Sequence, residues 1–155
     1  MKIKAATVIV LALTAACGKD ALGPSPVSEL VNAPVQVRVA GVDLTLETYL
    51  YRDFQPITPP NGQPMIAAVR VKAADGEELP AGLEAEVLHV LYGEEVWVAA
   101  PLEEHPSTDP GVMEVVARNG PKWGPGVTVD VVLRLRHGRN TLLLRAPAQQ
   151  IHRTD

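Results

Sequence analysis

The sequence of 155 residues is poor in cysteine, in aromatic residues and in long apolar runs. Cys17 is the only cysteine, so no disulfide can form within one chain. Aromatic side chains amount to one Phe, two Trp and three Tyr. The uncharged apolar run at residues 5–16 is well below the roughly 20 residues that a helix needs to cross a bilayer. Stability must therefore come from an ordinary hydrophobic core, for which the chain is long enough.

The sequence also lacks recognisable catalytic, cofactor-binding and metal-binding motifs. The histidines are His89, His105, His137 and His152. They lie too far apart for the close ligand spacing of zinc-binding motifs. The acidic loops at residues 75–78 and 103–109 lack the alternating oxygen ligands of an EF-hand. Because the sequence also lacks a phosphate-binding glycine loop and a nucleophile elbow, it predicts no cofactor, no metal and no enzymatic activity.

The charge of the chain argues against a nucleic-acid partner. The formal net charge is −4, whereas phosphate backbones are bound by basic surfaces. Residues 117–155 nevertheless hold half of the Lys and Arg residues and only two acidic ones. A basic docking patch would explain this asymmetry. The favoured interpretation is that these basic residues pair with acidic residues on neighbouring strands.

The N-terminus has the features of an export signal. Lys2 and Lys4 precede the apolar residues 5–16, and small residues stand directly before Cys17. A cysteine just after the expected cleavage point resembles the lipobox of bacterial lipoproteins. The resemblance implies cleavage after the first 16 residues and attachment of fatty acyl chains such as palmitate to the cysteine. It also implies that the mature chain is anchored to a membrane of the cell envelope.

Two neighbouring residues bear on this interpretation. Gly18 is not the aspartate-type signal that retains lipoproteins in the inner membrane, so the outer membrane is favoured. Thr14 departs from the aliphatic residue usual three places before the cysteine. The alternative is an ordinary signal peptide followed by an incidental free thiol at Cys17.

The rest of the chain divides into a linker and one domain. Residues 18–34 are rich in proline and small polar residues, a composition typical of flexible linkers. The sequence therefore predicts a signal peptide at residues 1–16, a lipid-anchored flexible tether at 17–34 and a single, monomeric domain at 35–155.

The domain alternates apolar and polar residues with a period of two, which is typical of half-buried strands. In the clearest stretch, residues 127–136, the apolar side chains are Val127, Val129, Val131, Leu133 and Leu135. Arg134 and Arg136 are expected to face solvent. Further strands are expected at residues 35–50, 65–73, 83–92, 95–100, 112–118 and 141–146, between turns rich in glycine and proline. The pattern predicts an all-β fold of about seven to eight strands and no long helix.

This layout is similar to immunoglobulin-like and fibronectin type III-like domains over roughly residues 35–152. The resemblance implies an immunoglobulin-like antiparallel β-sandwich. It rests on the strand pattern alone, because the paired cysteines of antibody domains are absent.

Three aromatic residues are the candidate contact residues. Trp123 stands in a loop rich in glycine and proline, either as an exposed contact or, as favoured, folded back over the core. Tyr49 and Tyr51 are two residues apart on one expected strand, so they share a face.

These features favour a non-catalytic, membrane-anchored envelope lipoprotein with a binding or structural β-sandwich domain. Its partner would be an envelope protein or a glycan. One alternative is a carbohydrate-binding module that uses Tyr49 and Tyr51. The other is an envelope hydrolase, which would need a pocket with converging Asp, Glu or His side chains.

Overall fold

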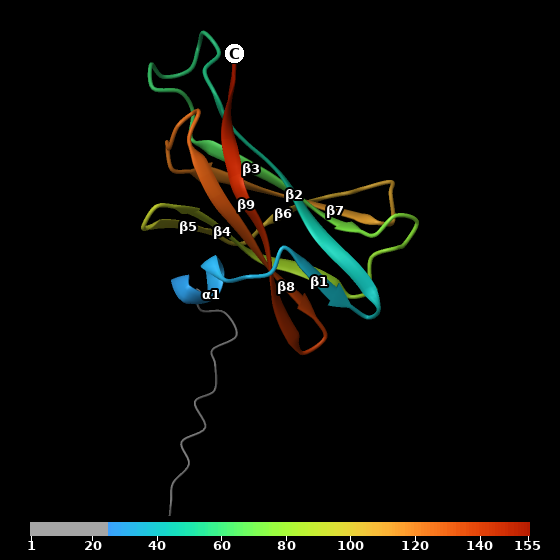
Figure 1. Ribbon diagram of the computed structural model, residues 1–155. Coiled ribbons are helices and arrows are strands. Elements are labelled where there is room, and N and C mark those ends of the chain that lie inside the picture. Colours follow the sequence, from blue (N-terminus) through green and yellow to red (C-terminus); the bar gives the residue numbers. More distant parts are fainter. Residues whose placement is uncertain (1–24) are drawn as a thin grey trace, which may run out of the picture.

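The computed structural model describes residues 25–155. The expected signal peptide, Cys17 and the first part of the expected tether lie outside the described residues. The described chain is mostly β-strand, with one short helix, which confirms the expected all-β class (Figure 1). Its elements are α1 (Val27–Val31), β1 (Gln36–Val39), β2 (Val42–Asp53), β3 (Met65–Ala73), β4 (Leu83–Tyr92), β5 (Glu95–Ala99), β6 (Glu103–His105), β7 (Val112–Gly120), β8 (Thr128–His137) and β9 (Asn140–Thr154). Within residues 25–155, no helix has the length and apolar character needed to cross a membrane.

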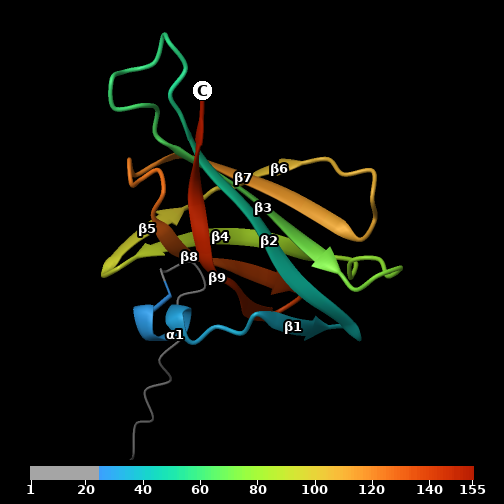
Figure 2. The same cartoon turned by 45° about the horizontal axis from the view of Figure 1, so that its top comes forward.

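The strands form one continuous, curled sheet. Their order is β5-β4-β8-β9-β2-β3-β7-β6, with β1 paired to β2. All neighbouring strands are antiparallel except β2 and β9, which run parallel. β5 and β7 stand near opposite ends of this order and still contact each other, because the sheet folds over on itself (Figure 2). The finer expectation of an immunoglobulin-like sandwich is not established, because β9 joins the two halves into one sheet.

A single hydrophobic core fills the space between the two halves. The expected inward set of β8 lies in it, with Val129, Val131, Leu133 and Leu135 fully or almost fully buried. The facing half contributes side chains from β2 and β3, among them Leu44, Leu50, Val69 and Val71. The ring of Trp97 from β5 closes one side against Gly120 of β7. A Cβ atom on Gly120 would lie 2.8 Å from that ring, so glycine allows the approach.

The end of the expected tether packs on the outer face of β4, β8 and β9. Leu30 and Ala33 are buried in a second, smaller cluster with Leu91 and Val132. Arg145 of β9 fixes the same segment, since its backbone N–H donates to the carbonyl of Pro34 at 2.8 Å and its Nε to that of Ala33 at 3.0 Å. The packed domain therefore begins near Val27. In the sequence, the proline-rich composition of this segment makes its two docking apolar side chains difficult to recognise.

Arg134 on the same outer face corrects another expectation. Its side chain was expected in solvent, but the residue is only 4% exposed and its Nε lies 3.4 Å from Oε2 of Glu86. The alternation along β8 shows which face is apolar, but it does not show whether the other face is covered. Arg136 forms ion pairs with Glu84 and Glu86 of the neighbouring strand β4. The favoured interpretation of the uneven charge expected such pairing.

His89 of β4 is fully buried beside these charges. Burial lowers the pKa of His89 below its ordinary value of 6.5, and the positive charge of Arg134 lowers it further. A contact with the backbone of Val132 opposes these two effects but does not cancel them. The ring of His89 is therefore neutral at pH 7.

A buried arginine near the end of β2 connects two loops. Arg52 of β2 is 3% exposed and donates to the carbonyls of Gln63 at 2.9 Å, Lys122 at 3.0 Å and Gly124 at 2.6 Å, as well as to that of Asn61. It thereby joins the loop between β2 and β3 to the loop that carries Trp123.

Docking of the N-terminal segment is testable with a matched pair of substitutions. Leu30→Ala should lower the free energy of unfolding by about 2–4 kcal/mol, because it empties a fully packed site. Val31→Ala should change it by no more than about 0.5 kcal/mol, because Val31 is exposed. Urea unfolding followed by circular dichroism measures both. Equal effects of the two variants would show that α1 does not pack on the sheet.

The buried histidine makes stability depend on pH. Because the pKa of His89 is lower in the folded than in the unfolded chain, the unfolded state binds protons more readily below the ordinary value of 6.5. Stability should therefore be full above that value and fall as the pH drops below it toward the lower pKa of the folded state. Unfolding free energies at several pH values would show this decline. His89→Gln should flatten it, and an unchanged slope in that variant would contradict the assignment.

Candidate functional site

Two open hollows lie side by side on the outer face of β2, β3 and β7. The first has a volume of about 330 Å³ and is lined by Glu47, Thr48, Tyr49, Ala68, Arg70 and Glu114. The second has a volume of about 460 Å³, shares three of these residues and extends over Lys72 to the loop at residues 106–109. We call this surface, with its outward side chains Glu47, Tyr49, Ala68, Arg70, Lys72 and Glu114, the β2–β3–β7 face.

Strand register produces the hollows. Alternation along β2 sends Leu44 and Leu50 into the core and Glu47 and Tyr49 outward. Tyr49 lies directly across from Ala68 of β3, which in turn faces Val116 of β7. The small side chain of Ala68 between larger neighbours leaves the first hollow open.

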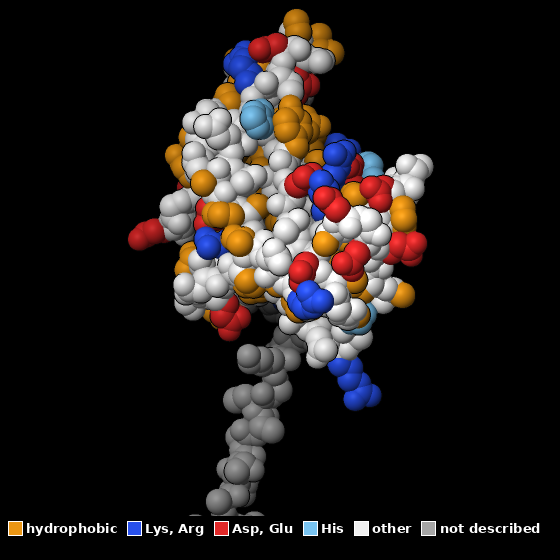
Figure 3. Space-filling view, turned by 45° about the vertical axis from the view of Figure 1, so that its right-hand side comes forward, with side chains coloured by type: hydrophobic (Ala, Val, Ile, Leu, Met, Phe, Trp, Pro, Cys, Tyr) orange, Lys and Arg blue, Asp and Glu red, His pale blue; other side chains and the backbone are white. Residues whose placement is uncertain are grey.

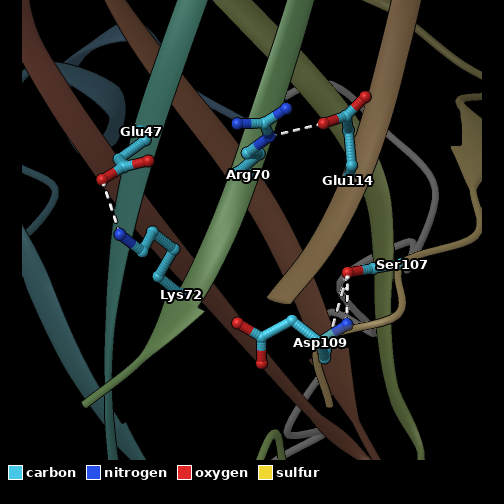
Figure 4. Close-up of polar contacts among 6 residues, drawn as sticks. All are labelled: Glu47, Arg70, Lys72, Ser107, Asp109 and Glu114. Atoms are coloured by element: carbon cyan, nitrogen blue, oxygen red, sulfur yellow. Dashed lines mark hydrogen bonds and ion pairs between the residues drawn. The ribbon is translucent and has the colours of Figure 1, made fainter. Parts of the chain in front are cut away.

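One row further along, charges of opposite sign alternate across the strands. The register aligns Glu47 of β2, Arg70 of β3 and Glu114 of β7. Arg70 Nε forms an ion pair with Glu114 Oε2, and Lys72 Nζ lies 2.8 Å from Glu47 Oε1 (Figure 4). The hydrogen bond to Glu114 raises the pKa of Arg70, and the one to Glu47 raises the pKa of Lys72. These side chains therefore stay charged and largely neutralise one another.

The loop before β7 closes the far end of the second hollow. Ser107 and Asp109 hold each other there, because the N–H of Asp109 donates to Ser107 Oγ at 3.1 Å (Figure 4). The carboxylate of Asp109 also accepts the N–H of Gly111 at 2.8 Å. Figure 3 shows acidic and basic side chains intermingled on the surface that it presents, without a large area of one charge.

An aromatic row borders the first hollow. The rings of Tyr49 and Tyr51 lie side by side with centroids 5.3 Å apart, as their spacing on one strand requires. Tyr49 is 48% exposed, whereas Tyr51 is half-buried. His152 of β9 stacks on Tyr49 with centroids 5.1 Å apart and an interplanar angle of 20°. Sequence reasoning missed His152, because no local pattern signals the parallel pairing that brings it beside Tyr51.

Trp123 lies apart from the β2–β3–β7 face. Its half-buried ring packs against the main core and lies 5.5 Å from the ring of Tyr92. Cys17, the expected site of lipid attachment, is outside the described residues. The candidate contact residues are thus divided, with the two tyrosines beside the hollows and the tryptophan elsewhere.

The chemistry available on the β2–β3–β7 face is that of binding. A tyrosine ring supplies a flat apolar surface, and the carboxylates and guanidinium supply hydrogen-bond acceptors and donors. Between residues 25 and 155, no group of three His, Asp or Glu side chains is arranged to hold a metal ion.

Comparison of the chain with models of known protein families, with curated proteins and with solved structures finds no match. The residues and their geometry are therefore the basis for assigning a function.

The ion pairs of this face should contribute little to folding. Lys72 and Glu47 are 42% and 56% exposed in their side chains, and exposed pairs typically contribute about 0–1 kcal/mol. Lys72→Ala should therefore cost almost no stability in a urea titration. A much larger loss would mean that the face is a structural element of the fold.

Proposed function

We propose that the protein is a non-catalytic lipoprotein of the bacterial cell envelope whose all-β domain binds a partner through the β2–β3–β7 face. The observation that carries the binding role is the pair of joined hollows between Tyr49 and the loop at residues 106–109. The basis for the envelope location is the resemblance of Cys17 and the preceding residues to a lipobox.

Rigidity of the scaffold supports a binding role. β2 and β3 are internal strands: β3 pairs with β2 and β7, and β2 pairs with β3 at residues 44–51 and with β1 and β9 at residues 42–45 and 50–53 of its other edge. Their outward side chains therefore stand on an ordered backbone. The cross-strand ion pairs further restrict Glu47, Arg70, Lys72 and Glu114. A ligand would meet side chains that already occupy their places, which reduces the entropy lost on binding.

The placement of the N-terminal segment is compatible with an anchored protein. α1 packs on the outer face of β4, β8 and β9, which is the other half of the curled sheet (Figure 1). The β2–β3–β7 face lies across the core from that segment. Attachment through Cys17 would therefore leave the hollows accessible.

The anchoring part of the proposal predicts that Cys17→Ser abolishes lipid attachment and leaves the fold unchanged. Metabolic labelling with a fatty acid should mark the wild type and not the variant. Circular dichroism should give both proteins the same strand content. Equal label on the two proteins would refute the anchor.

The binding part of the proposal predicts that filling the first hollow abolishes association with envelope material. The Cys17→Ser chain should sediment with isolated cell envelopes, and Ala68→Arg should reduce that fraction by about tenfold. Val98→Arg is the matched control, because Val98 is an exposed residue of β5 in the other half of the sheet. Unchanged retention of the Ala68→Arg variant would refute binding at this face.

A further inference from the structure

We infer that the ligand of the β2–β3–β7 face is a neutral glycan, with one sugar ring stacked on Tyr49. This inference rests on the proposed function and specifies the class of its ligand. It follows from the geometry of the aromatic row, the polar groups beside it, the balance of charge and the size of the hollows.

The aromatic row gives Tyr49 one covered side and one open side. The strand order β9-β2-β3 places His152 on one side of Tyr49 and Ala68 on the other. His152 stacks on the ring, whereas the side toward Ala68 borders the first hollow. A sugar ring presents apolar C–H groups on its faces, and these complement the electron-rich face of an aromatic ring.

The polar side chains beside this ring suit hydroxyl groups. Glu47, Arg70 and Glu114 all line the first hollow with Tyr49. Carboxylates accept hydrogen bonds at two oxygens, and a guanidinium offers five N–H donors in one plane. Arg70 uses its Nε for Glu114, so further donors of the same group can serve a ligand. Neighbouring hydroxyls of a sugar can donate to the carboxylates and accept from the arginine at the same time.

The balance of charge excludes a strongly charged ligand. Glu47, Glu114 and Asp109 are opposed by Arg70 and Lys72, and four of these five side chains are paired with one another. A polyanion would meet three carboxylates, and a cation would meet two basic groups. A neutral hydroxyl-rich ligand makes charge-assisted hydrogen bonds to both kinds of group without separating the pairs.

The size of the hollows favours a glycan over a protein partner. The hollows of about 330 and 460 Å³ fall within the range of roughly 300–1,000 Å³ that is usual for small-molecule sites. Because they adjoin, a chain of sugars could follow them from Tyr49 toward Ser107. A stable protein interface covers about 800 Å² on each partner, which is a much larger surface than the lining of these hollows.

The test is calorimetric titration of the Cys17→Ser chain with soluble neutral oligosaccharides. The probes are β-1,4-linked oligomers of glucose and of N-acetylglucosamine, with oligogalacturonate as the charged comparison. A neutral oligomer should bind. Tyr49→Ala should weaken that binding by about tenfold or more, because it removes the stacking surface. Tyr49→Phe should preserve it within about threefold, since the ring remains.

Two further variants guard against misfolding as the explanation. Ala68→Leu adds an ordinary strand-compatible side chain and should block the hollow with the melting curve unchanged. Tyr92→Ala removes a tyrosine that packs on Trp123, away from the hollows, and should leave glycan binding unchanged.

Each contrary result has a definite meaning. Binding that is insensitive to both Tyr49→Ala and Ala68→Leu would overturn the site. Tighter binding of the charged oligomer would overturn the neutral class. If no oligosaccharide binds at about 10 mM while Ala68→Arg still abolishes envelope retention, the glycan inference is overturned and the proposed binding function stands.

Discussion

The fold depends on the hydrogen bonding of β9 to both halves of the sheet. Residues 140–146 and 149–150 pair antiparallel with β8, and residues 151–154 pair parallel with β2. A bulge where Ala148 has a φ of 54° interrupts the pairing with β8 shortly before β9 reaches β2. Asp130 stabilises this bend, since its carboxylate accepts the N–H of Ala148 at 2.9 Å and Nη1 of Arg145 at 3.1 Å. Without such an acceptor the backbone N–H in the bulge would lack a protein partner. The closed core and the position of His152 beside the tyrosines both follow from this bend.

The same strand connects the fold to the N-terminal segment. Arg145 is held by Asp130 on one side and binds the carbonyls of Ala33 and Pro34 on the other. The outer face of β8 and β9 is consequently covered, and β8 buries residues on both of its faces. The outer face of β2, β3 and β7 has no such cover among the described residues. The two halves of one sheet thus have different surroundings, and this asymmetry leaves one face accessible to a ligand.

Local sequence patterns predicted the positions of the strands well. They did not predict which strands pair or which faces are covered by other parts of the chain. Residues 65–73 and 83–92 form strands with the expected bounds, and Leu133 points inward as its alternation requires. Arg134 is buried beside Glu86 of β4, which alternation along β8 cannot reveal. β9 continues past Pro147, although proline normally ends a strand, because residues 149–150 pair again with β8 and residues 151–154 pair with β2. The sequence marked Tyr49 as a candidate contact residue, but the hollow beside it depends on the alignment of Ala68 with its neighbours, which requires the register of three strands.

Stability does not explain the composition of the β2–β3–β7 face, which suits the binding role proposed for it. Exposed ion pairs such as Arg70 with Glu114 contribute little to folding, and a half-exposed tyrosine buries only part of its ring. A β-branched residue in place of Ala68 or Arg70 would suit the middle of a sheet at least as well. A small residue flanked by a tyrosine and by paired charges instead creates a recess with an apolar wall and hydrogen-bonding groups along its side. Because the core and the β9 bend already hold β2 and β3 in place, these outward positions are available for recognition.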